Sequence, residues 1–257
     1  MKKNKFIMSM TVDAMFLALI AILSFVPYIG YISIGPISFT IIHIIVLIGA
    51  LLFGTGKGTL YGLFFGLFSL FKALTYPGTL DYLFVNPFVS VLPRVLFGLV
   101  SGLVFDCVRK RTTFKNYLLI CAPLAGLLTF VHTFLTLTCL YVFGYLDIFQ
   151  ISKFLGISDL IEQANNSFGN FWNFLLLCIA PGTVCEIAAG AIISPLLFAA
   201  LYKGFGKGIL GQNGVVLPFR EEGEDTLSKK SLILIVVGLG VLAIVLCAVL
   251  LALFYTK

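Results

Sequence analysis

Residues 84–98 read FVNPFVSVLPRVLFG and place one arginine, Arg94, inside a long apolar run. A guanidinium stays charged at any physiological pH, and a position within hydrocarbon is costly unless the charge faces a partner or a cavity. Pro93 sharpens this expectation, because proline lacks an N–H and leaves a backbone carbonyl free one turn earlier. The stretch therefore predicts a membrane helix with a functional arginine. The alternatives are an arginine that reaches the lipid headgroups, or one that neutralises an acid on a neighbouring helix.

The composition of the whole chain is that of a membrane protein. Of its 257 residues, 60% are hydrophobic and 11% are charged, and the mean hydropathy is +1.10. A soluble domain does not have this composition, so we predict an all-α, polytopic membrane protein. Its six cysteines are scattered through apolar segments without a CxxC pair, which is typical of packing residues rather than of a metal or disulfide site. No cofactor is predicted.

Seven apolar segments are long enough to cross a membrane about 30 Å thick. The first follows the basic N-terminus and is predicted to be a retained helix rather than a cleaved signal. The segments cover about residues 8–29, 37–53, 59–74, 84–108, 116–143, 171–202 and 231–255. Between them we expect a hydrophobic loop at 31–36, a tight polar turn at 54–58, a long polar connection at 144–170 with room for a surface helix at 158–167, and an acidic stretch at 211–230.

The distribution of basic residues predicts the orientation of the chain. If the N-terminus is cytoplasmic, the inner segments hold almost all lysines and arginines, while the outer loops hold Lys153 and several acids. Positively charged loops stay in the cytoplasm. The N-terminus is therefore predicted to be cytoplasmic, and Arg94 to lie in the outer half of the membrane.

Few polar residues lie within the apolar segments, and most have a structural interpretation. Asp13 and Asp106 are predicted to meet basic loops. Glu186 is interpreted as a counter-ion of Arg94 or as a group that carries a proton. The remaining polar residues are Lys72, His43 and His132, and the two histidines lack the spacing of metal ligands.

Two sets of small residues indicate where helices approach closely. Gly58, Gly62 and Gly66 share one face of their helix, which predicts packing within the molecule. Ala14, Ala18 and Ala21 form a second small face, which is suited to a helix of another subunit.

The glycine-rich segment 54–59 does not match the phosphate loop GxxxxGK[ST], so the chain is not predicted to hydrolyse ATP.

Polar and aromatic residues converge near the predicted outer ends of the helices. Part of this set is the ordinary aromatic belt of a membrane protein. Amides beside a buried cation suit a small polar ligand with a carboxylate, captured from outside beneath a loop. The residues are Tyr28, Tyr31, Tyr76, Asn86, Arg94, Asn170, Trp172 and Asn173.

With these features the chain resembles the S components, the substrate-binding membrane subunits of energy-coupling factor (ECF) vitamin transporters. The resemblance covers about residues 6–208 and rests on the six-helix layout, the Ala14-x-x-x-Ala18 pair, the run IGPISFTIIHIIVLIGALLFGTGKGTLYGLFFGLFSL and FVNPFVSVLPRVLFG. It is nearest to the pantothenate-type subunits. The resemblance implies a bacterial plasma-membrane protein whose alanine face docks on a transmembrane coupling protein driven by two cytoplasmic ATPases.

The resemblance implies a six-helix substrate-binding domain at 1–208. The sequence that follows predicts a cytoplasmic acidic linker at 209–230 and a seventh transmembrane helix at 231–257. The linker and seventh helix depart from the six-helix pattern, as does the long segment before helix six. The function expected is capture of a vitamin, without bond chemistry and without a metal. The predicted ligand-binding residues are Arg94, Asn86, Asn170, Asn173, Trp172, Tyr31 and His43.

Several alternatives stay open at this point. The vitamin could be riboflavin or another one rather than pantothenate. The chain could also be a proton-coupled secondary transporter that uses Glu186, an intramembrane enzyme that uses His43, His132 and Glu186, or an assembly protein without a ligand.

Overall fold

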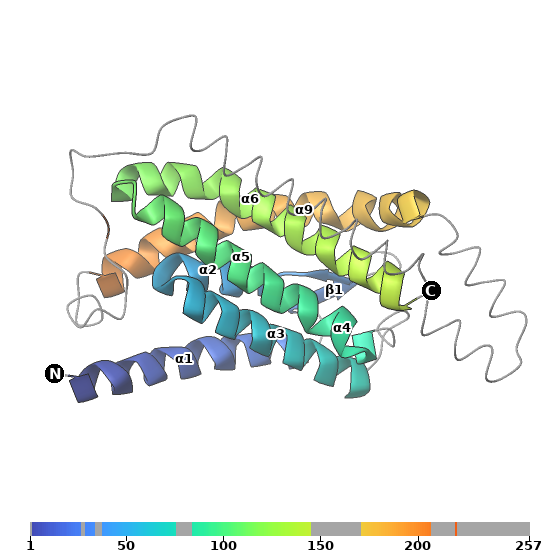
Figure 1. The fold of residues 1–257 in the computed structure, drawn as a ribbon, viewed down its shortest axis with the longest axis horizontal. Coiled ribbons are helices and arrows are strands. Elements are labelled where there is room, and N and C mark those ends of the chain that lie inside the picture. The colour runs from blue at the N-terminus through green and yellow to red at the C-terminus, as the bar shows by residue number, and fades with distance from the viewer. Residues whose placement is uncertain are drawn as a thin grey trace, which may run out of the picture.

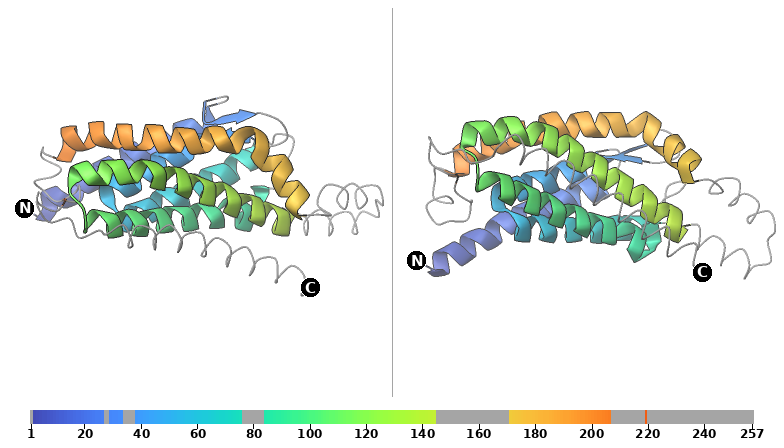
Figure 2. Two further views of the ribbon diagram at one scale, coloured as in Figure 1. Left: turned by 90° about the horizontal axis from the view of Figure 1, so that it is seen from above. Right: turned by 45° about the horizontal axis from the view of Figure 1, so that its top comes forward.

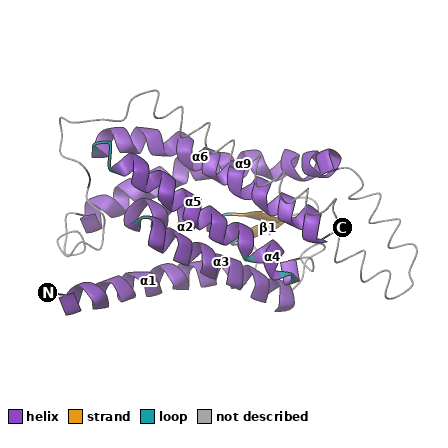
Figure 3. Cartoon of the chain, viewed as in Figure 1, coloured by secondary structure: helices purple, strands orange, loops and turns teal. Residues whose placement is uncertain are grey.

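The computed structural model describes residues 2–26, 29–33, 38–75, 84–144, 171–206 and 219. Helices dominate the described part, and one short hairpin interrupts them (Figure 3). The elements in chain order are α1 (Lys2–Phe25), β1 (Tyr31–Ser33), β2 (Ser38–Thr40), α2 (Ile42–Phe53), α3 (Thr55–Thr75), α4 (Pro87–Ser90), α5 (Leu92–Arg109), α6 (Phe114–Cys139), the π-helical turn η2 (Leu140–Gly144), α9 (Phe171–Leu201) and the π-helical turn η3 (Tyr202–Gly206).

The helices form one bundle, with α2, α3 and α5 between the outer helices. Helix α1 lies along one side of the bundle, and α6 and α9 lie along the other (Figure 1). Within the described residues, six helices have twelve or more residues, and five helical segments are long and apolar enough to cross a membrane. The prediction of an all-α polytopic membrane protein is confirmed. The predicted surface helix at 158–167 and the seventh helix at 231–255 lie outside the described residues.

The second predicted span is wrong in its first part. Helix α2 has 12 residues and begins at Ile42 rather than near residue 37. At 1.5 Å per residue it is about 18 Å long, which is less than the roughly 30 Å of a bilayer core. The preceding segment instead forms strands β1 and β2, which pair antiparallel with Tyr31 opposite Thr40. Strand β2 contacts α9, and the hairpin lies at the edge of the bundle beside it (Figure 2).

The predicted polar turn at 54–58 is in fact a single residue, Gly54. Its φ of 81° is a left-handed conformation that glycine adopts without strain, and α3 begins at the next residue. The first turn of α3 is capped from α5, because the Oδ2 atom of Asp106 accepts hydrogen bonds from the backbone N–H and the hydroxyl of Thr55, at 2.9 and 2.7 Å. A carboxylate at a helix N-terminus satisfies free N–H groups and opposes the positive end of the helix dipole.

Asp13 joins α1 to the beginning of α3. Its carboxylate forms an ion pair with Lys57 and accepts a hydrogen bond of 2.8 Å from the hydroxyl of Tyr61. The ring of Phe16 stacks on that of Tyr61 with centroids 5.0 Å apart. The prediction that Asp13 and Asp106 have structural roles beside basic residues is therefore confirmed, since Asp106 also pairs with Arg109.

The glycine face of α3 packs against α5, as predicted. A Cβ atom on Gly58 would lie 2.8 Å from the carbonyl oxygen of Gly98, and one on Gly66 would lie 2.7 Å from the Cα atom of Val91. A Cβ atom on Gly62 would collide with the carbonyl oxygen of Arg94. Contacts this short allow only hydrogen atoms at these positions. The glycine face of α3 therefore determines how closely the backbone of Arg94 approaches this helix.

Candidate functional site

The chain enters the Arg94 region through a short capped helix. Asn86 caps α4, because its Oδ1 atom accepts a hydrogen bond of 3.0 Å from the backbone N–H of Phe88, and Pro87 occupies the first helical position. The fourth predicted helix is divided at Val91, where α4 ends and α5 follows. Pro93 explains the break, because it cannot donate to the carbonyl of Val89 one turn earlier.

Arg94 uses the carbonyl that Pro93 leaves free. Its Nη1 atom donates a hydrogen bond of 2.5 Å to the backbone oxygen of Val89. This bond was not predicted from the sequence, and it holds the guanidinium close to the helix break. The bond also helps to fix the orientation of the guanidinium.

The guanidinium of Arg94 is buried but largely unpaired. The residue is 3% exposed, and its carbon atom Cζ lies 5.0 Å from the ring centre of Phe84 and 5.6 Å from that of Phe65. Its Nε atom has no hydrogen-bond partner, and the described residues place no carboxylate within ion-pair distance. A guanidinium has five N–H donors, and Val89 accepts from one of them. The arginine therefore has N–H donors that could bind an anion.

Two buried histidines lie beside this arginine. The rings of His43, on α2, and His132, on α6, are 5.9 Å apart, and that of His132 is 4.6 Å from the ring of Phe97. Within the described part of the chain, both nitrogens of His43 and the Nδ1 atom of His132 lack a hydrogen-bond partner. Histidines and cysteines or acids do not form a metal-binding group of three anywhere in the described ranges.

Glu186 on α9 does not pair directly with Arg94. It lies within electrostatic range of the guanidinium, but the ion pairs among described residues do not join the two. Its Oε1 atom instead accepts a hydrogen bond from the backbone N–H of Thr40, and its Oε2 atom one from the hydroxyl of Thr133, both at 2.8 Å. Glu186 is therefore not a direct ion-pair partner of Arg94, although it remains close enough to interact with the guanidinium electrostatically. The carboxylate fastens strand β2 to α6 and α9.

The structure brings together three of the seven predicted ligand-binding residues. Arg94 and His43 line the interior, and Tyr31 on β1 lies within electrostatic range of Arg94, with its ring 4.3 Å from the Nζ atom of Lys72. Asn86 caps α4 with one amide atom. Asn170 lies outside the described residues, and Trp172 and Asn173 belong to the first turn of α9, where the structure describes only the backbone.

The small face of α1 is on the outside of the bundle. Ala14 and Ala18 are exposed, and Ala21 is partly buried. The opposite face of α1 packs inward through Phe16 and Ile20, which are 9% and 0% exposed. Exposed apolar side chains surround the alanines, so this face meets lipid or another protein.

Comparison with known proteins gives the family of this chain. A family model for the substrate-specific component of ECF transporters matches residues 8–206. This chain belongs to that family. Pantothenate transporter PanT of Leuconostoc mesenteroides subsp. mesenteroides is 30% identical over 189 residues, which cover 72% of this chain and 87% of that protein.

The family match gives this S component its class: a multi-pass membrane protein that takes part in transport. The matched region begins within α1 and ends at the last residue of η3, so it contains the described bundle apart from residues 2–7 and leaves residues 207–257 outside. The resemblance inferred from the helix order, the alanine pair and residues 84–98 is confirmed.

Sequence reasoning missed several residues that shape the site of the S component. Thr40 and Thr133 are far apart in the chain, and only the fold brings both to Glu186. A signal for the hairpin was present, because Gly35-Pro36 separates two short runs that contain aromatic and β-branched residues. No comparable pattern in the sequence predicts that His43 and His132 face each other.

Proposed function

We propose that this S component captures a small vitamin with a carboxylate, and that the vitamin is pantothenate. The observation that carries the proposal is the buried guanidinium of Arg94, which lacks a carboxylate partner among the described residues. A carboxylate ligand would supply the missing charge and accept two parallel N–H bonds. The 30% identity to a protein named as a pantothenate transporter supports the choice of vitamin.

The vitamin is proposed to bind from the outside of the cell, and a separate ATP-driven module is proposed to power its uptake. Basic residues gather at one end of the bundle, where α3 and α6 begin and α5 and η3 end, and Arg94 lies toward the other end. This distribution supports a cytoplasmic N-terminus and a ligand site that opens outward. The exposed face of Ala14 and Ala18 is proposed to dock on a transmembrane coupling protein, which two cytoplasmic ATPases drive.

Titration calorimetry with the purified full-length protein tests this proposal. The panel contains pantothenate, riboflavin and other B vitamins, each added to the ligand-free protein. We expect tight one-to-one binding of pantothenate alone. Binding of riboflavin instead would change the vitamin and keep the class, whereas a panel without any binding would overturn vitamin capture.

His132 is proposed to bind a hydroxyl or amide group of the vitamin. A neutral imidazole offers one donor and one acceptor, and pantothenate carries hydroxyl and amide groups beside its carboxylate. His132→Phe keeps a ring among Phe97 and Phe65 and removes the polar atoms. We expect pantothenate binding to weaken about tenfold, which corresponds to one lost hydrogen bond of about 1.4 kcal/mol.

Pantothenate analogues that each lack one hydroxyl or the amide N–H are the control for this substitution. An analogue without the group that His132 binds should bind the wild type and the His132→Phe variant equally well. If the substitution weakens every analogue as much as pantothenate, His132 acts through packing rather than through a hydrogen bond.

A further inference from the structure

Four aromatic rings form a cage at the end of the bundle opposite Arg94. They come from the start of α6, the end of α9 and η3, and two of them, Tyr117 and Phe198, are fully buried. Their centroids lie 4.9 to 6.1 Å from one another in the contacting pairs. The aromatic cage is defined by Phe114, Tyr117, Phe198 and Tyr202.

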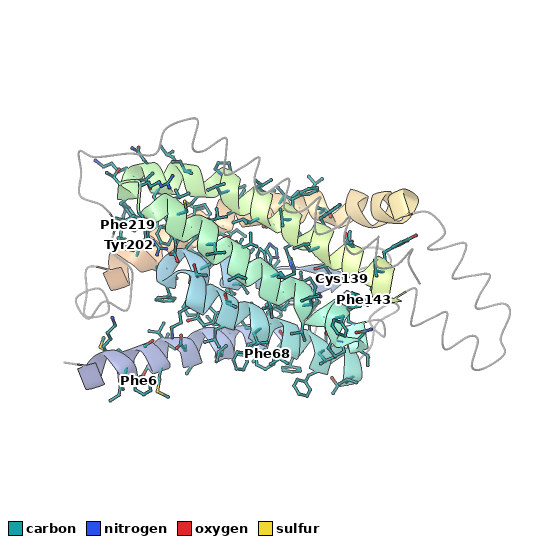
Figure 4. The ribbon with its side chains drawn as sticks, viewed as in Figure 1. Phe6, Phe68, Cys139, Phe143, Tyr202 and Phe219 are labelled. Carbon is teal, nitrogen blue, oxygen red and sulfur yellow. The ribbon has the colours of Figure 1, made fainter. Side chains whose placement is uncertain are left out.

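The ring that contacts all four members of the aromatic cage belongs to Phe219. Its centroid is 4.8 Å from that of Tyr117, 4.9 Å from Tyr202, 5.4 Å from Phe114 and 6.2 Å from Phe198. Figure 4 shows Phe219 beside Tyr202 at one end of the bundle, far from Cys139 and Phe143 at the other. Phe219 comes after the region that the family model matches, in the predicted acidic linker at 209–230.

The guanidinium of Arg109 lies near two of these five rings. The guanidinium carbon of Arg109 lies 5.8 Å from the ring centre of Phe219 and 5.7 Å from that of Tyr117. Arg109 is held in place by the carbonyl of Leu51 and by Asp106, so its position does not depend on Phe219. Aromatic pairs and a cation near a ring both add attraction beyond the burial of apolar area.

We propose that the aromatic cage is a docking site for Phe219, and that this contact clips the polar stretch to the bundle. The cage is built from α6, α9 and η3, whereas α1 packs on α3 and α2 on the other side of the bundle (Figure 1). The clip therefore holds the chain at residue 219 on the side away from Ala14 and Ala18. If the alanine face docks as proposed above, the clip keeps residue 219 away from the docking surface.

Limited digestion of the full-length protein with trypsin tests the clip without any assumption about ligand or partner. Trypsin cuts after Arg220, the residue next to Phe219, and a protease needs the chain to detach locally before it cuts. Phe219→Ala should accelerate this cut about tenfold or more. Phe219→Trp should keep it slow, because a ring can still enter the cage.

Two controls separate docking from general loosening. Phe71→Ala removes a ring that is 53% exposed on α3, and it should not change the rate at Arg220. Tyr202→Ala removes one wall of the cage and should accelerate the cut in the same way as Phe219→Ala. Equal rates in the wild type, Phe219→Ala and Tyr202→Ala would overturn the proposal, and so would a Phe219→Trp variant that is cut as fast as Phe219→Ala.

Discussion

Replacement of Arg94 by methionine is expected to weaken pantothenate binding at least about 100-fold while the ligand-free protein stays folded. Methionine resembles arginine in length but cannot pair with a carboxylate. In the ligand-free protein it removes a buried charge that lacks an ion-pair partner in the described part of the chain, which favours stability. The lost bond to Val89 costs about 1 kcal/mol in the other direction. Calorimetry measures the affinity, and thermal unfolding measures the stability.

Arg109 is the matched control for this prediction, because it is the second buried arginine of α5 and, unlike Arg94, has a carboxylate partner among the described residues. It is 2% exposed, pairs with Asp106 and donates to the carbonyl of Leu51 and the hydroxyl of Tyr117. Arg109→Met should therefore lower stability by about 3 kcal/mol and leave pantothenate affinity unchanged. An Arg94→Met variant that binds pantothenate as the wild type does would remove the basis of the proposed function.

The features of the fold that were predicted correctly depend on residues that are close together in the sequence. Pro93 lacks an N–H, so the chain alone predicts a free carbonyl one turn earlier, and in the structure this is the carbonyl of Val89. Gly58, Gly62 and Gly66 share a helix face by spacing alone, and the packing of α5 against that face follows from the need for small residues at close helix contacts. Both predictions are confirmed by the structure.

The parts that sequence reasoning missed depend on contacts between distant segments. The start of α3 at Thr55 is fixed by Asp106, which is 51 residues away, so residues 55–58 are predicted to be a turn although they form the first turn of α3. Glu186 binds Thr40 across 146 residues, and this backbone contact makes the hairpin its partner rather than Arg94. Periodicity within one segment carries no information about such pairs.

Replacement of Ala14 by tryptophan is expected to reduce ATP-driven uptake about tenfold or more while ligand binding changes less than about twofold. Ala14 is exposed on α1, so the larger side chain can point outward without disturbing the contact of Phe16 with Tyr61. Small residues at a helix interface allow two backbones to approach closely, and an indole at that point forces them apart. Co-purification of the coupling protein and uptake into proteoliposomes measure docking, and calorimetry measures the ligand site.

Leu119→Trp is the matched control, because Leu119 is 75% exposed on α6, on the other side of the bundle from α1. It places the same indole on a surface that is not proposed to dock, so uptake should be unchanged. The two substitutions separate a specific interface from a general effect of bulky residues in the membrane. If Ala14→Trp transports and co-purifies as the wild type does, the exposed alanine face is a lipid-facing surface, and the coupling protein must bind elsewhere on the bundle.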